Sequence, residues 1–183
     1  MVPAVLRFRW FGPLVLMVLG LSAMPARALD GVTFEGGWGS SDTAMARASF
    51  QWDWKTRSLQ GANWHVGGYW DAGLSYWNHD NTPTGENDEL FDFNLTPVFR
   101  LQPNGLAGPY AEAGVGAHLL TSTSIGNRSL GTSYQFGSHV GVGYRFDRKG
   151  FEVGYRIQHI SNAAIKEPND GINFHQLRLR YHY

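Results

Sequence analysis

Residues Phe151 to Ser161 read Phe-Glu-Val-Gly-Tyr-Arg-Ile-Gln-His-Ile-Ser, a stretch in which apolar and polar side chains alternate. Successive side chains of a β-strand point to opposite faces, so the stretch predicts a strand with one apolar and one polar face. The apolar row is Phe151, Val153, Tyr155 and Ile157, and the polar row is Glu152, Gly154, Arg156 and Gln158. His159 and Ser161 continue the apolar row. On that face they could serve as base and nucleophile for an apolar substrate.

The same alternation recurs along the rest of the chain. The alternating segments are Val32–Trp38, Ala46–Trp54, Trp64–Tyr76, Phe91–Phe99, Ala111–Leu119, Phe136–Phe146, Phe151–Ser161 and Asn173–Tyr183. They predict an all-β fold of about eight strands, a number known for closed antiparallel transmembrane barrels.

The composition favours a membrane barrel over a soluble one. The chain has no cysteine, 23 glycines and 14% aromatic residues, and its mean hydropathy is only −0.29. Dense aromatics with low mean hydropathy are typical of membrane strands, because half of their residues face a polar interior. The alternative is a soluble lipocalin-like or streptavidin-like cup, whose core would have to hold the tryptophan-rich rows.

The N-terminal residues predict export. Arg7 and Arg9 precede the apolar run Trp10–Leu21, and Ala26-Arg27-Ala28 has the pattern of a cleavage site. We expect a signal peptide over residues 1–28 and a barrel domain over residues 29–183. A transmembrane anchor is the alternative, but the apolar run is shorter than the roughly 20 residues that a membrane helix needs.

Charge argues against a nucleic-acid partner. The chain has 15 basic and 15 acidic residues, and removal of Arg7, Arg9 and Arg27 leaves the remainder with a formal charge of −3. Inside a barrel, charged residues are expected to pair with one another, so we expect a packed polar interior and not a channel. The inward charges of this kind are Glu35, Arg47, Asp71, Glu112, Arg156 and Arg178.

The connections between the predicted strands alternate in length. The longer polar segments are Trp77–Glu89, Thr121–Thr132 and Asn162–Ile172, and the shorter turns are Thr56–Ala62, Gln102–Gly108 and Asp147–Gly150. Outer-membrane barrels keep short turns in the periplasm and longer loops outside. The strand from Phe151 to Ser161 therefore runs outward, and we expect His159 and Ser161 at the level of the outer leaflet of a bacterial outer membrane.

The run from His159 to Gly171, HISNAAIKEPNDG, resembles the signature of the PagL family of lipid A 3-O-deacylases. The resemblance extends to Trp52-Asp53-Trp54, to the segment Tyr69–Gly73, and to the strand count and chain length. It implies a serine esterase that hydrolyses the 3-O-linked hydroxyacyl ester of lipid A within lipopolysaccharide, and it implies no cofactor or metal.

The resemblance also implies roles for individual residues. Ser161 is matched to the nucleophile and His159 to its general base and later acid. Asn162 and Ala164 are matched to the oxyanion-hole positions, and Ala164 stands where we expect a glycine. A backbone N–H survives this exchange if the local dihedral angles tolerate a Cβ atom.

One position departs from the family pattern. The glutamate that completes the family's triad aligns with Asn173, which lies on the outward row of the last strand. An asparagine can hold a histidine tautomer, although it lacks the charge that would stabilise the imidazolium. Glu167 and His175 are alternatives for this role.

Other functions fit the same barrel. A phospholipase or acyltransferase would use the same serine chemistry, and a structural or adhesive barrel would use none. The loop charges Lys166 and Arg128 are expected to be solvated and not to contact lipid phosphates.

Overall fold

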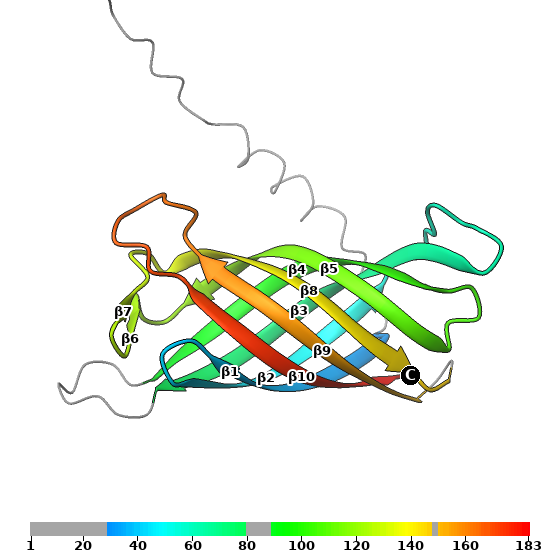
Figure 1. Ribbon diagram of the computed structural model, residues 1–183, viewed down its shortest axis with the longest axis horizontal. Helices are drawn as coiled ribbons and strands as arrows, with labels where there is room; N and C mark the ends of the chain where they lie inside the picture. Colours follow the sequence, from blue (N-terminus) through cyan, green and yellow to red (C-terminus); the bar gives the residue numbers. More distant parts are fainter. Residues whose placement is uncertain (1–28, 80–88, 148–149) are drawn as a thin grey trace, which may run out of the picture.

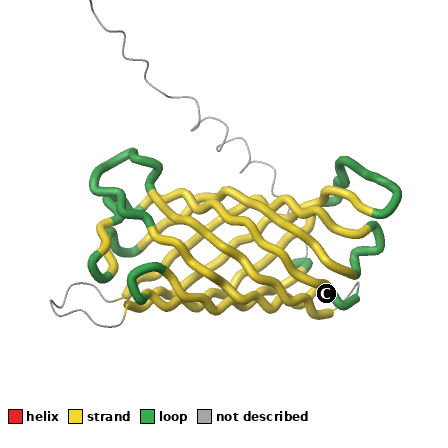
Figure 2. Tube along the Cα trace, in the orientation of Figure 1, coloured by secondary structure: helices red, strands yellow, loops and turns green. Residues whose placement is uncertain are grey.

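Eight long antiparallel strands close into a barrel, which confirms the predicted fold (Figures 1 and 2). The computed structural model describes residues 29–79, 89–147 and 150–183, so the predicted signal peptide lies outside the described residues. The strands are β1 (Gly31–Gly39), β2 (Thr43–Asp53), β3 (Trp64–His79), β4 (Glu89–Pro103), β5 (Gly108–Leu120), β6 (Ser124–Ile125), β7 (Arg128–Ser129), β8 (Tyr134–Arg145), β9 (Gly150–Ser161) and β10 (Ile172–His182). Around the barrel the order is β1-β10-β9-β8-β5-β4-β3-β2. Among the described residues no helix is long and apolar enough to cross a membrane.

The two ends of the barrel differ in their connections. At one end, which we name the turn end, lie the connections β2–β3 and β4–β5 and the C-terminus (Figure 1). At the other, which we name the loop end, lie the β1–β2 turn, the segment between β5 and β8, and the segment 162–171. The predicted outward end of β9 is therefore at the loop end.

The segment between β5 and β8 is more ordered than the sequence indicates. Thr121–Thr132 is predicted as a polar loop, but β6 and β7 form a short hairpin within it. Gly126 permits the turn with a φ of 53°, and its Cα lies against the ring of His79. Ile125 and Leu130 are buried, so this loop folds back onto the mouth of the barrel.

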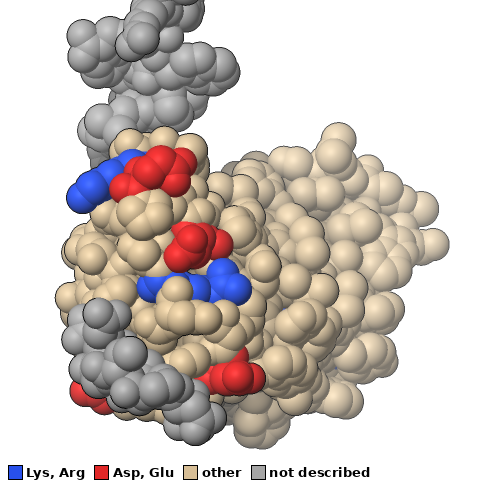
Figure 3. All heavy atoms as spheres, turned by 60° about the vertical axis from the view of Figure 1, so that its left-hand side comes forward, with Lys and Arg blue, Asp and Glu red and all other residues tan. Residues whose placement is uncertain are grey.

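The outward rows of the strands are apolar, as the alternation predicts. Phe34, for example, is 64% exposed and Phe93 is 51% exposed. In the view of Figure 3 the visible charged side chains lie at the loop end, while the stretch of barrel wall in the same view is uncharged. An exposed apolar wall of this kind is suited to a lipid environment.

The middle of the interior is a network of paired charges. Glu112 accepts hydrogen bonds from Tyr69 Oη (2.8 Å), Arg100 Nη2 (2.7 Å) and Arg156 Nη2 (2.9 Å), and Arg178 is a further donor to it. Related contacts are Arg47 to Glu35 and Asp71, Arg178 to Glu35, Arg100 to Glu152, and Arg180 to Asp53. The prediction of a packed polar interior is confirmed for this region.

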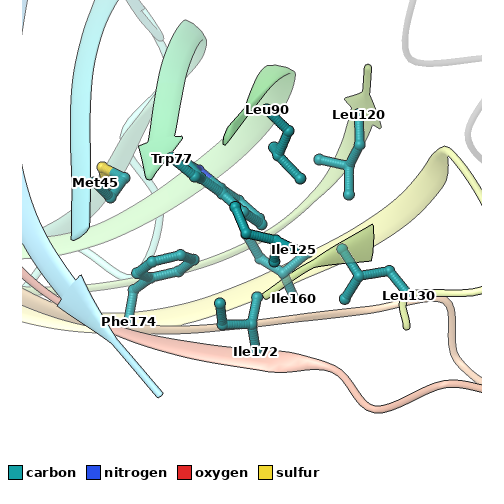
Figure 4. Close-up of a cluster of buried hydrophobic side chains, with 9 residues drawn as sticks. All are labelled: Met45, Trp77, Leu90, Leu120, Ile125, Leu130, Ile160, Ile172 and Phe174. Atoms are coloured by element: carbon teal, nitrogen blue, oxygen red, sulfur yellow. The ribbon is translucent and has the colours of Figure 1, made fainter. Parts of the chain in front are cut away.

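The loop end of the interior is apolar, which the sequence did not predict. Nine buried side chains close it, and we name them the apolar plug (Figure 4). They are Met45, Trp77, Leu90, Leu120, Ile125, Leu130, Ile160, Ile172 and Phe174. The prediction that Trp77 begins a loop is wrong, because Trp77 is an inward residue of β3 whose ring centroid lies 4.7 Å from that of Phe174. The plug lies directly beneath the segments that carry His159 and Ser161.

Replacement of Glu112 by alanine should destabilise the barrel strongly. It would leave the guanidinium groups of Arg100, Arg156 and Arg178 without a shared buried carboxylate. Removing one partner from a buried ion pair typically costs about 3–5 kcal/mol. The midpoint of urea unfolding in detergent should fall accordingly.

Glu89→Ala is the matched control for this experiment. Glu89 accepts a hydrogen bond from Tyr76 on the exposed surface, and exposed polar contacts contribute little to stability. Equal urea midpoints for Glu112→Ala and Glu89→Ala would contradict a structural role for the interior network.

Candidate active site

His159 and Asn173 face each other across β9 and β10. They are paired residues in the antiparallel register, and both are exposed on the outward row. The Nδ1 atom of His159 lies 2.7 Å from Oδ1 of Asn173. Because an amide oxygen only accepts hydrogen bonds, this contact places the proton on Nδ1 and leaves Nε2 free to accept one.

Ser161 is the last residue of β9 and lies on the same row as His159. It is half-buried, and Gly171 packs against it. A Cβ atom on Gly171 would lie 3.0 Å from Cε1 of His159 and 3.4 Å from Cβ of Ser161. Among the described residues, the Ser161 hydroxyl has no hydrogen bond to His159. Catalytic hydrogen bonds are often long without substrate and shorten when it binds.

The main chain of Asn173 is held by the β1–β2 turn. The Ser40 N–H donates to the carbonyl oxygen of Asn173 at 2.9 Å, and the Asn173 N–H donates to Ser40 Oγ at 3.2 Å. These two contacts fix the start of β10. The amide that contacts His159 Nδ1 is therefore carried on a backbone segment that is hydrogen-bonded to the neighbouring turn.

Asn162, the residue after Ser161, is fully buried. Its side-chain Nδ2 donates to the carbonyl oxygens of Leu130 (2.9 Å) and Lys166 (2.8 Å). Its backbone N–H, matched above to an oxyanion-hole donor, donates to Oδ1 of Asn169 at 3.0 Å. In this state the Asn162 amide is engaged by the loop itself.

Ala163 and Ala164 form a turn with left-handed backbone angles. Their φ values are 53° and 60°, and the Ile165 N–H closes the turn with the carbonyl oxygen of Asn162 at 3.1 Å. Ala164 thus occupies a conformation that suits glycine, and the left-handed region costs about 1–2 kcal/mol for a residue with a Cβ atom. Within the described part of the chain the Ala164 N–H has no partner, so it is an open donor three residues after Ser161.

The two alternatives to Asn173 are placed differently. His175 lies opposite Ile157, and its Nδ1 is 2.5 Å from the Tyr155 hydroxyl. Its ring also stacks on Trp38, with centroids 5.8 Å apart. Glu167 is exposed in the loop. The structure brings Asn173, and neither alternative, to His159 Nδ1.

His159 is one of the residues that line an apolar groove of about 560 Å³ on the outer wall. The groove crosses β4, β5, β8 and β9, and its apolar lining includes Pro97, Phe99, Val115, Val140 and Ile157.

In the described ranges, no three His, Asp or Glu side chains gather closely enough to hold a metal ion.

The fold and the site together define an outer-membrane-type β-barrel with a histidine–asparagine pair and a serine on its exposed apolar wall. The family model described as "Lipid A 3-O-deacylase (PagL)" matches residues 44–182. The chain therefore belongs to the PagL family of lipid A 3-O-deacylases, a family of ester-hydrolysing outer-membrane enzymes.

Individual relatives agree with this assignment. Lipid A deacylase PagL from Pseudomonas aeruginosa is 35% identical over 153 residues, which are 83% of this chain and 85% of the relative. Lipid A deacylase PagL from Bordetella bronchiseptica is 34% identical over 113 residues, which are 62% of this chain and 61% of the relative.

Solved structures match as well. The crystal structure of the outer membrane enzyme PagL superposes with a TM-score of 0.75 at 32% identity, covering 84% of this chain and 99% of that one. A designed transmembrane β-barrel shares the fold alone, with a TM-score of 0.51 at 9% identity over 87% of this chain and 98% of that one.

The role of Asn173 can be tested by substitution. Asn173→Ala removes the acceptor for Nδ1–H and should lower kcat by about 10- to 100-fold, with KM unchanged because orientation matters in the transition state. Asn173→Glu supplies a carboxylate and should keep or raise kcat. Ring ¹⁵N shifts of His159 should show the Nδ1–H tautomer in the parent and a mixture in Asn173→Ala. A fully active Asn173→Ala with an inactive His175→Ala would place the orienting group elsewhere.

The left-handed turn after Ser161 gives a second test. Ala164→Gly removes the steric cost of the Cβ atom, so hydrolysis should persist and the loop should resist proteolysis better. Ala164→Val adds a β-branched side chain at a φ of 60° and should lower kcat by misplacing the backbone N–H. Normal turnover by the valine variant would show that this N–H has no part in the reaction.

Proposed function

We propose that the protein hydrolyses the 3-O-linked hydroxyacyl ester of lipid A in the outer leaflet, with Ser161 as nucleophile and His159 as general base. The observation that carries the proposal is the His159–Asn173 contact. It leaves Nε2 of a lipid-facing histidine free, on the same row as a serine. A polar pair on a lipid-facing wall costs free energy because hydrocarbon does not solvate it. Its presence there therefore points to a function.

The proposed reaction proceeds through an acyl-enzyme. Nε2 of His159 takes the proton of the Ser161 hydroxyl while Oγ attacks the ester carbonyl carbon. The tetrahedral intermediate collapses as the C–O bond to the sugar breaks, and His159 returns the proton to the departing 3-hydroxyl. A water then attacks the acyl-enzyme with His159 again as base, which releases the free hydroxy acid and restores Ser161.

Backbone donors stabilise the oxyanion in this proposal. The Ala164 N–H is open to the substrate, and the Asn162 N–H becomes available when Asn169 Oδ1 turns away from it. Asn173 keeps the imidazole in the productive tautomer throughout.

The position of the site supports a membrane lipid as substrate. His159 lines the apolar groove, and Ser161 lies two residues further along β9, so an acyl chain in the groove would run along the outer wall with its ester near this pair. A lipid in the outer leaflet reaches this arrangement by lateral diffusion and does not enter the barrel.

Outer membranes that contain each variant can be tested with lipopolysaccharide and mass spectrometry. The parent protein should remove one hydroxyacyl group from lipid A. Ser161→Ala and His159→Asn should each lower the rate by at least about 10²–10⁴-fold, with unchanged heat-modifiable migration on gels. Ser58→Ala, at the turn end, serves as the matched control.

The products separate the competing functions. Transfer of an acyl chain to another lipid would indicate an acyltransferase, and release from phospholipids alone would indicate a phospholipase. Unchanged lipids would indicate a barrel without enzymatic activity. Near-normal turnover by Ser161→Ala would rule out Ser161 as the nucleophile.

A further inference from the structure

Arg128 joins three segments at the loop end of the barrel. It begins β7, and its Nε donates to Ser41 Oγ in the β1–β2 turn at 2.7 Å. Its Nη1 donates to the carbonyl oxygens of Asp170 (3.2 Å) and Gly171 (2.8 Å). The expectation of a solvated loop charge is therefore wrong for this residue. Its guanidinium is engaged on two sides.

The hairpin that carries Arg128 is joined by further contacts to the segment 162–171, which we name the active-site loop. The Ser129 N–H donates to Oδ2 of Asp170 at 2.6 Å, and the Asp170 N–H donates back to the Ser129 carbonyl oxygen at 3.1 Å. The next residue, Leu130, accepts from the side chain of Asn162. The hairpin and the active-site loop thus form one hydrogen-bonded unit.

The carbonyl groups held by Arg128 belong to the backbone beneath the reactive side chains. Gly171 has a φ of 60°, and its Cα faces His159 and Ser161 at close range. A shift of Gly171 would therefore move the surface against which both side chains pack.

Arg128 also reaches Asn173 from the other side. Ser41, which accepts the Nε–H of Arg128, directly follows Ser40, and Ser40 makes both backbone contacts to Asn173. One guanidinium thus restrains two segments. Its bond to Gly171 holds the chain just before Asn173, and its bond to Ser41 holds the β1–β2 turn beside Asn173.

We infer that Arg128 is a positioning residue for the His159–Asn173 pair, an inference that rests on the proposed function. The planar guanidinium has rigidly directed donors, so it can bond the hydroxyl and the two carbonyl oxygens together. A lysine ammonium has a single donor centre and cannot span the same acceptors. Arg128 acts through Gly171 and Ser41 and does not touch the substrate.

The test uses the full-length protein in detergent micelles with two substrates, lipid A and lipid A stripped of its phosphates. Arg128→Gln should lower kcat by about 10- to 100-fold, because small misplacements of catalytic groups are costly, with KM unchanged. The loss should be equal for both substrates. Arg128→Lys should restore little of it. Arg57→Gln, the same exchange at an exposed arginine of the turn end, should leave kcat unchanged.

A spectroscopic measurement reports on positioning directly. Ring ¹⁵N shifts of His159 should show one tautomer in the parent protein and a mixture in Arg128→Gln. Ser41→Ala, which removes only the Nε acceptor, should lower kcat less than Arg128→Gln does. If Arg128→Gln fails to fold, the same measurements of kcat and of the His159 tautomer are made on Ser41→Ala.

Three results would overturn the inference. A raised KM for phosphorylated lipid A alone would make Arg128 a phosphate ligand. Equal kinetics for Arg128→Gln and Arg57→Gln would make it an ordinary loop charge. An unchanged His159 tautomer in Arg128→Gln would exclude positioning. If the parent protein hydrolyses neither substrate, the proposed function fails, and the ¹⁵N measurement still decides the role of Arg128.

Discussion

Closure of the barrel between β1 and β10 is the constraint on which the rest of the structure depends. A strand edge that faces lipid would leave unpaired backbone groups where no water can satisfy them, so a membrane sheet has to close on itself. The β1–β10 ladder, from Gly31–His182 to Gly39–Phe174, completes the ring. The site lies beside this ladder, because Asn173 belongs to β10 and is held by Ser40 just beyond the end of β1.

The filling of the interior makes the wall a rigid support. The charged network around Glu112 fixes the middle of the barrel, and the apolar plug fixes the loop end. Ile160 and Ile172 of the plug alternate with His159, Ser161 and Asn173 along β9 and β10. The same two strands are therefore anchored by inward packing and carry the candidate site on their outward face, so the positions of the three candidate residues depend on packing on the opposite face of the sheet.

The alternation of the strands predicted the face on which His159 and Ser161 lie. With a period of two residues, the assignment of one side chain to a face fixes the face of every other side chain in the strand. It also predicted the inward charges and the outward parity of Asn173. It did not predict the β6–β7 hairpin, the continuation of β3 through Trp77 or the contacts of Arg128. The hairpin and the Arg128 contacts depend on how loops fold over the mouth of the barrel, which alternation does not encode. The apolar Ile125 and Leu130 in a polar segment were the available signal for the hairpin. The hydrogen bond from the Asn162 N–H to Asn169 Oδ1 could not be predicted from the sequence pattern.

The apolar plug has a consequence for the cell that carries the protein. A barrel with a water-filled lumen would admit small solutes across the outer membrane whenever it was present, whereas this interior is packed with paired charges and sealed by nine apolar side chains. The reaction proposed above takes place on the outer wall, so it needs no passage through this interior. The permeability barrier of the membrane is therefore kept intact while the composition of its surface is changed.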